Sequence, residues 1–209
     1  MRDYVAWHDA YGVPGSPLRR RLEVVIRFLG EALDRAASGP CRFVSLCAGQ
    51  GDDVLTVAAT HHRGGDLVGR LVELDPVNAA VATRRVTELG RDDIEVVVAD
   101  AGSTDACVGA VPADLVVACG IFGNVSTDDI ERTVRAFPSL CAPGGWVLWT
   151  RHPREPGVLE GIERWFEESG FERDALVVDD EQHWAVGLHH LVAEPAPFVP
   201  GPHLFTFVR

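Results

Sequence analysis

The chain has 209 residues, of which 46% are hydrophobic, and it carries a formal net charge of −12 at pH 7. This length and apolar content suffice for one ordinary domain with a full core, so we expect a single structural domain. An acidic protein is repelled by the phosphate backbone of nucleic acids, whose binding proteins generally carry a basic stripe. The composition therefore argues against nucleic acid as a partner.

The cysteines and the hydropathy pattern indicate the compartment. Five cysteines without a Cys-x-x-Cys pair are typical of a reducing environment and of a protein without structural zinc. No basic and apolar leader opens the chain, and no apolar run approaches the ~20 residues that span a bilayer. No two-histidine, one-carboxylate spacing indicates a metal site. We expect a cytoplasmic protein without metal or membrane contact; its oligomeric state is not predicted.

Residues 1–40 show no strand pattern and are predicted to form a helical N-terminal arm. The arm has a turn at residues 14–17 and an amphipathic helix from about residue 18 to residue 37. Its first part carries four ring-bearing side chains, Tyr4, Trp7, His8 and Tyr11. Such a cluster is compatible with a lid over a ligand and equally with an arm pinned to the core.

The chain from residue 41 onward alternates short Val- and Leu-rich runs with longer amphipathic segments. The predicted strands are 42–47, 66–73, 94–99, 113–119 and 146–150. Near-continuous apolar strands separated by helices predict a parallel sheet covered on both faces. The helices have matching boundaries: Asp75 with Pro76 begins one and Gly90 ends it, and Ser126 with Asp129 forms a capping box.

The last part of the chain changes character. Residues 175–178, 184–192 and 204–208 are strand-like, but only turn-forming residues separate them. An antiparallel hairpin at one sheet edge is the economical interpretation. The predicted fold class is thus α/β: a doubly wound, mostly parallel seven-stranded sheet with helices on both faces and an antiparallel C-terminal hairpin. Residues 41–209 form this Rossmann-like part.

The most informative segment is residues 44–53, Val-Ser-Leu-Cys-Ala-Gly-Gln-Gly-Asp-Asp, in which an apolar strand runs into glycines and then a helix. A dinucleotide-binding turn needs a third glycine, which is missing. Asp52 and Asp53 in the first helical turn would repel a pyrophosphate. A cofactor that brings a cation or a zwitterion would tolerate them. Two acidic strand ends follow, at Glu73 and Asp100, and should meet the turn at one sheet edge.

This ordered set resembles the class I S-adenosylmethionine (SAM)-dependent methyltransferases over roughly residues 41–170. The resemblance implies that Glu73 binds the ribose hydroxyls and that Asp100 accepts from the adenine amino group. It also implies that the Ala101 amide meets a ring nitrogen, and that the Cys119 carbonyl with Gly120 faces the methionine ammonium. The implied cofactor-binding residues are Cys47, Ala48, Gly49, Gly51, Glu73, Leu74, Asp100, Ala101, Cys119 and Gly120.

Two residues depart from the family pattern: Ser45 replaces an acidic residue and Cys47 replaces the first glycine. A cysteine substitutes for glycine where the backbone angles are ordinary, and we expect ordinary angles at Cys47. Cys47 and Cys119 are interpreted as small buried side chains and not as nucleophiles.

The resemblance places the acceptor pocket at the N-terminal segment and at the loops after the fourth and fifth strands. His152, directly after the fifth strand, is the first candidate for a base, and His8 is the second. The other candidate substrate residues are Tyr4, Trp7, Tyr11, Phe122, Asn124 and Arg151. His183, His189 and His190 are interpreted as surface or core residues of the hairpin.

The acceptor is predicted to be a small molecule, because the loop at residues 119–126 lacks the Asp/Asn-Pro-Pro-Tyr motif of enzymes that methylate amino groups of nucleic acids. The methylated atom is not predicted. Three functions stay open: a small-molecule methyltransferase, a non-catalytic SAM-binding or scaffold domain and, with less support, an NAD(P)-dependent oxidoreductase.

Overall fold

The structure is a computed structural model that describes residue 13, residues 15–152 and residues 157–208. The aromatic cluster predicted at Tyr4, Trp7, His8 and Tyr11 lies outside the described residues.

A seven-stranded sheet with the strand order β3-β2-β1-β4-β5-β7-β6 forms the centre of the structure. Its strands are β1 (Cys41–Leu46), β2 (Leu67–Glu73), β3 (Ile94–Val98), β4 (Ala113–Ala118), β5 (Cys141–Arg151), β6 (Phe171–Asp179) and β7 (Trp184–Leu191). β1 to β5 are parallel, and β7 lies antiparallel between β5 and β6. The predicted doubly wound sheet and C-terminal hairpin are confirmed. The strand order reverses between β1 and β4, which is where such sheets open a crevice for ligands.

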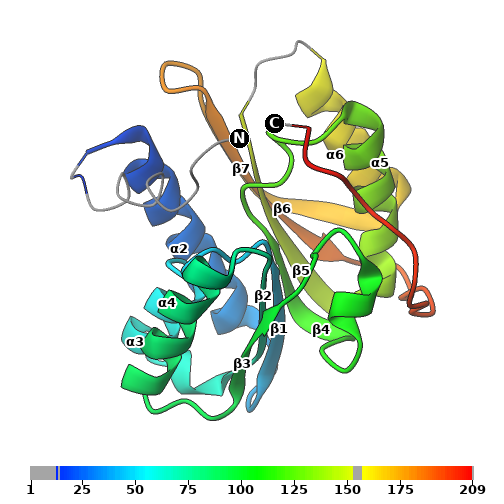
Figure 1. Cartoon of the computed structure of the whole chain (residues 1–209). Coiled ribbons are helices and arrows are strands. Elements are labelled where there is room, and N and C mark those ends of the chain that lie inside the picture. Colours follow the sequence, from blue (N-terminus) through cyan, green and yellow to red (C-terminus); the bar gives the residue numbers. More distant parts are fainter. Residues whose placement is uncertain (1–12, 14, 153–156, 209) are drawn as a thin grey trace.

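Helices cover both faces of the sheet (Figure 1). They are α2 (Pro17–Arg35), α3 (Val54–Thr60), α4 (Pro76–Glu88), α5 (Thr127–Ala136) and α6 (Val158–Glu168). One apolar core contains Phe28 of α2 and Leu55 of α3, and the other contains Ile130 of α5 and Phe166 of α6. Each helix thus buries one apolar stripe against its side of the sheet. No helix within the described ranges is both long and apolar enough to cross a membrane.

The predicted helix caps form. The Asp75 carboxylate accepts from the amides of Val77 and Asn78, and the Ser126 hydroxyl accepts from the amide of Asp129. These bonds satisfy donors that the first turn of a helix leaves unpaired. They fix the points at which the chain leaves β2 and the loop after β4.

Two strands are longer than predicted. β5 begins at Cys141, which pairs with Ala113 ahead of a register shift between Ala113 and Leu115. β6 begins at Phe171, and its pairing with β7 is irregular between Arg173 and Ala175. Glycines in the first strand and exposed charged residues in the second hide the apolar pattern, because backbone pairing does not require apolar side chains.

The strand predicted at residues 204–208 is wrong. This segment joins no sheet; the residue before it, His203, makes an isolated antiparallel bridge with Ser103. Its amides bond to loops instead: Leu204 donates to the Gly102 carbonyl at 2.6 Å and Val208 to the Asn124 carbonyl at 2.9 Å. Leu204 and Phe205 are nevertheless fully buried, which explains the apolar pattern.

Candidate cofactor site

The turn after β1 has a left-handed backbone at three residues. The φ angles are +56° at Cys47, +57° at Gly49 and +72° at Gly51. A Cβ on Gly51 would lie 2.7 Å from Cδ1 of Leu55, so that position also lacks room for a side chain. The expectation of ordinary angles at Cys47 is wrong, because the turn needs a left-handed residue there. For a residue other than glycine this conformation costs about 1–2 kcal/mol.

Glu73, at the end of β2, is bonded to the turn. Its Oε2 accepts from the Gly49 amide at 2.7 Å, and its Oε1 accepts from the Asp75 amide at 2.8 Å. The side chain is buried. Because Asp75 itself caps α4, Glu73 is free of that task, as the sequence indicated. A carboxylate has about four acceptor sites, so two stay open for further donors.

Asp100 lies beside Glu73 on the neighbouring strand end. Val98 is the ladder partner of Glu73, and the Ala99 amide donates to the Glu73 carbonyl at 3.1 Å. The Asp100 side chain is exposed, and its Oδ1 accepts from the Gly102 amide at 2.8 Å. Leu74, which follows Glu73 in the chain, is 60% exposed, which is unusual for leucine. It leaves an apolar surface at the strand ends that carry the two carboxylates.

The loop after β4 completes the edge. Gly120 has φ +78°, and its amide donates to the Thr150 hydroxyl at the end of β5 at 2.8 Å. The Asn124 side chain donates to the Gly120 carbonyl at 2.7 Å. Because β1 and β4 are paired, the backbone around Cys119 lies next to the turn that follows β1. The two hydrogen bonds then fix the loop at Gly120.

The two thiols at this edge are protonated at neutral pH. Burial raises the pKa of Cys47 far above its usual range, and the carboxylates of Glu73 and Asp100 raise it further. Burial likewise raises the pKa of Cys119, and the carboxylate of Asp53 adds to the effect. The nucleophile is the thiolate, so neither residue is suited to nucleophilic chemistry.

Asp53 is a buried carboxylate next to the turn. Its Oδ1 accepts from the Val54 amide at 2.7 Å, and its exposed fraction is 9%. Burial raises its pKa to about 6, the nearby carboxylate of Asp52 raises it as well, and the bond from Val54 opposes the rise. The guanidinium of Arg85 lies 2.6 Å from Asp52, so its direct ion pair is with the neighbouring acid. A cation placed near Asp53 would oppose the rise of its pKa.

The predicted acceptor residues are placed unevenly. Phe122 is fully buried, with its ring 5.8 Å from that of Trp149, and Arg151 is buried and donates to the Phe122 carbonyl at 2.6 Å. His152 is half-buried, and its ring lies 5.7 Å from that of His183. Packing thus accounts for Phe122, whereas His152 stays at the edge of the sheet with an imidazole beside it. His183 was interpreted from the sequence as a surface or core residue of the hairpin; it lies in the turn between β6 and β7, with φ +58°.

The fold brings two histidines and one carboxylate together outside this edge. The Nε2 atoms of His61 and His62 lie 3.4 and 3.3 Å from Oδ1 of Asp34. Nδ1 of His61 accepts from the Arg63 amide at 3.2 Å, so in the neutral ring the proton is on Nε2, the atom that faces Asp34. The ligand-type atoms of these three side chains lie within 4.8 Å of one another, and Asp34 and His62 are exposed.

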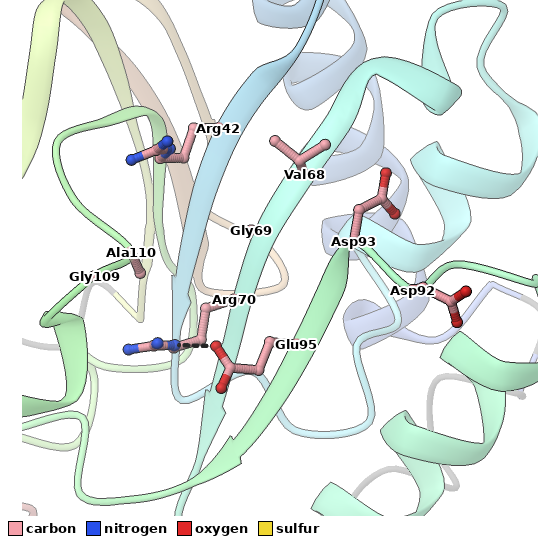
Figure 2. Close-up of a pocket in the computed structure, with 9 residues that line it drawn as sticks. All are labelled: Arg42, Val68, Gly69, Arg70, Asp92, Asp93, Glu95, Gly109 and Ala110. Carbon is pink, nitrogen blue, oxygen red and sulfur yellow. Dashed lines mark hydrogen bonds and ion pairs between the residues drawn. The ribbon is translucent and has the colours of Figure 1, made fainter.

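A pocket of about 240 Å³ lies at the opposite edge of the sheet, near the starts of β1, β2 and β3 (Figure 2). Its lining includes Arg42, Gly69 and Asp93, and also Arg70 and Glu95, which form an ion pair 2.8 Å long. The glycine turn, Glu73 and Asp100 are at the other ends of the same strands. This pocket is therefore separate from the candidate cofactor site.

Comparison with known proteins shows the fold. No family model and no curated protein matches the sequence. Magnesium protoporphyrin IX methyltransferase from Synechocystis PCC 6803, solved with bound SAM, is similar over 90% of each chain, with a TM-score of 0.72 and 10% identity. The chain thus has the fold of the class I SAM-dependent methyltransferases.

Other solved structures have the same fold with different acceptors in their names. Precorrin-6y C5,15-methyltransferase from Geobacter metallireducens GS-15 matches with a TM-score of 0.58 and 10% identity, over 82% of this chain and 87% of that one. The ribosomal protein L11 methylase from Lactobacillus delbrueckii subsp. bulgaricus matches with a TM-score of 0.56 and 17% identity, over 78% and 76%.

The strain at Cys47 predicts a difference between two substitutions. Cys47→Gly relieves the left-handed conformation, whereas Cys47→Ala keeps it, and both remove the thiol. The glycine variant should be more stable than the alanine variant by about 1 kcal/mol in urea unfolding. An alanine variant as stable as the glycine variant would contradict the strained turn.

Proposed function

We propose that the protein transfers a methyl group from SAM to a small-molecule acceptor. The observation that carries the proposal is the placement, at one edge of the sheet, of a glycine turn bonded to Glu73 with Asp100 on the next strand end. The proposal draws support from the fold, which is shared with methyltransferases solved with bound SAM and S-adenosylhomocysteine (SAH).

The adenosine end of the cofactor is assigned to β2 and β3. Glu73 would accept from the ribose hydroxyls with the acceptor sites that Gly49 and Asp75 leave open. Asp100 is exposed and would accept from the adenine amino group, while the amide of Ala101 would donate to a ring nitrogen. The exposed Leu74 would cover one face of the base.

The methionine end is assigned to the glycine turn and the loop after β4. The backbone of Ala48, Gly49 and Gly51 would approach the ligand closely because two of these residues have no side chain. The Cys119 carbonyl and Gly120 would face the ammonium group. We add Asp53 to this set, because a buried carboxylate close enough to Cys119 to raise the pKa of its thiol suits a nearby cation.

SAM, when bound, supplies an electrophilic methyl group on a sulfonium sulfur. The chain would orient the acceptor in line with that group, which is the main source of acceleration in such a displacement. His152 is assigned the role of taking a proton from the acceptor or orienting it. The predicted contributions of Asn124 and Arg151 would be indirect, because Asn124 holds Gly120 and Arg151 holds the Phe122 carbonyl. His8, Tyr4, Trp7 and Tyr11 stay predictions.

A small-molecule acceptor is favoured by charge. The net charge of −12 opposes a nucleic-acid substrate, and the acidic groups at the site would add to that repulsion. The acidic residues after the glycine turn also disfavour the pyrophosphate of a nicotinamide cofactor. Similar structures include methyltransferases whose names indicate a porphyrin and a ribosomal protein, so the shared fold does not select the class of acceptor.

The adenosine assignment predicts a loss of cofactor affinity. Asp100→Ala and Glu73→Gln each remove a charged acceptor and should weaken SAH binding by about ten- to a hundredfold in calorimetric titration. Asp92→Ala is the matched control, because Asp92 is an exposed acid just before the start of β3, and this variant should bind SAH as the wild type does. A loss below threefold for both site variants would show that the adenosine is misplaced.

The Asp53 assignment predicts a pH dependence. Asp53 with a pKa of about 6 is mostly protonated at pH 5 and mostly ionised at pH 7, whereas the ligand's amino group stays charged up to about pH 7.7. SAH affinity should therefore rise about tenfold from pH 5 to pH 7, and Asp53→Asn should flatten the rise. An Asn variant with the same pH profile as the wild type would remove Asp53 from the site.

In the free protein the same shift acts on stability. The pKa of Asp53 is raised on folding, so protonation of its carboxylate favours the folded state. This contribution to the free energy of unfolding is fully present below pH ~4 and is lost as the pH rises through ~6.

The assignment of His152 predicts a loss of turnover without a loss of cofactor. In a screen of metabolite acceptors, His152→Gln should lower turnover by about a hundredfold or more while SAH binding is retained. His62→Gln serves as the control, because His62 is largely exposed and lies near Asp34, away from His152 in the sequence. Unchanged turnover in the His152 variant would exclude it as the base.

A further inference from the structure

The C-terminal segment, residues 202–208, runs past α5 and links the two loops to which the proposed function assigns the ends of the cofactor (Figure 1). At its start, the Pro202 carbonyl accepts from the Thr104 amide at 3.0 Å, and the Leu204 amide donates to the Gly102 carbonyl at 2.6 Å. At its end, the Val208 amide donates to the Asn124 carbonyl at 2.9 Å. The segment is therefore attached to the loop after β3 and to the loop after β4.

The segment is also anchored between these two points. Leu204 and Phe205 are each 2% exposed and belong to the core beneath α5. The Thr206 amide donates to Asp129 of α5 at 3.1 Å. Such burial and bonding hold the segment in one place, which a residue that shapes a binding site requires.

The segment approaches Asp100 very closely at Gly102. A Cβ at residue 102 would overlap the Phe205 carbonyl oxygen, and it would lie 3.0 Å from both Cε1 of His203 and Oδ1 of Asp100. Cε1 of the His203 imidazole is thus within about 6 Å of Oδ1 of Asp100, the carboxylate that is assigned to the adenine amino group. His203 is exposed, and its Nε2 lies 3.0 Å from the Thr206 hydroxyl, which fixes the ring.

The adenine end of the site needs such a wall. β3 is the edge strand of the sheet, and Asp100 at its end is exposed. Leu74 offers an apolar surface on one side, but a purine gains most from contact on both faces. Segment 202–208 supplies backbone that bonds to Gly102 and Thr104 from outside that loop, and the Val199 carbonyl before it accepts from the Thr104 hydroxyl at 3.2 Å.

We propose that residues 202–208 form one wall of the purine-binding end of the cofactor site, with His203 in contact with the base. This inference rests on the proposed function and adds a binding element that follows the last strand of the sheet. Because the same segment is bonded to Asn124, which holds Gly120, it also sets the spacing between the purine end and the methionine end.

The test is calorimetric titration of wild type, His203→Ala and His62→Ala with SAH and with adenosine. His62 is the matched control, because its side chain is 71% exposed and is bonded to Asp34 on another part of the molecule. His203→Ala should weaken SAH about fivefold or more and adenosine by a similar factor, since the lost contact is to the base. The control should bind both ligands as the wild type does.

A second pair of variants tests the position of the segment. Gly102→Ala forces a Cβ against the Phe205 carbonyl, whereas Gly65→Ala places one in open space. SAH affinity should fall for the first variant and stay unchanged for the second.

The outcomes separate the two levels of the proposal. If the wild type binds SAH and His203→Ala matches it within twofold, the wall is disproved and the methyltransferase assignment stands. If the folded wild type binds neither SAH nor adenosine, the proposed function and this inference fail together.

Discussion

The carboxylate of Glu73 is the interaction on which the candidate site depends. It accepts from the amide of Gly49 in the turn after β1 and from the amide of Asp75 at the start of α4. It thereby fixes the left-handed turn against the end of the neighbouring strand. Parallel pairing then brings the ends of β3 and β4 to the same edge, where Asp100 and Cys119 follow. This connection and the parallel pairing together set the frame in which the remaining groups lie.

The electrostatics of this edge favour a ligand that brings hydrogen-bond donors or a positive charge. Glu73, Asp100 and Asp53 place three carboxylates around the turn, and Asp53 is buried. A pyrophosphate at this turn would meet like charges, which oppose its binding. An adenosine with hydroxyl and amino donors and a methionine with an ammonium group would meet acceptors at each point. The strained backbone at Cys47 is compatible with such a site, because strain is retained where the surrounding structure holds it in place.

The sequence predicted the sheet, its hairpin and the acidic strand ends, because apolar periodicity and helix caps are local signals. It did not predict the strain at Cys47, because a residue other than glycine rarely adopts a positive φ and only the path of the turn imposes it there. The segment at 204–208 was misjudged because burial of Leu204 and Phe205 looks the same in sequence whether the backbone joins a sheet or bonds to loops. The environment of Asp53 and the meeting of His61, His62 and Asp34 arise from tertiary packing alone.

The most direct test is a calorimetric titration of the purified protein with SAM, SAH and a nicotinamide dinucleotide side by side. The account predicts micromolar binding of SAM and SAH and no response to the dinucleotide. The absence of a binding signal with SAM and SAH from a folded sample would contradict the proposed function and favour a scaffold domain that keeps only the fold. A response to the dinucleotide would contradict it in favour of an oxidoreductase.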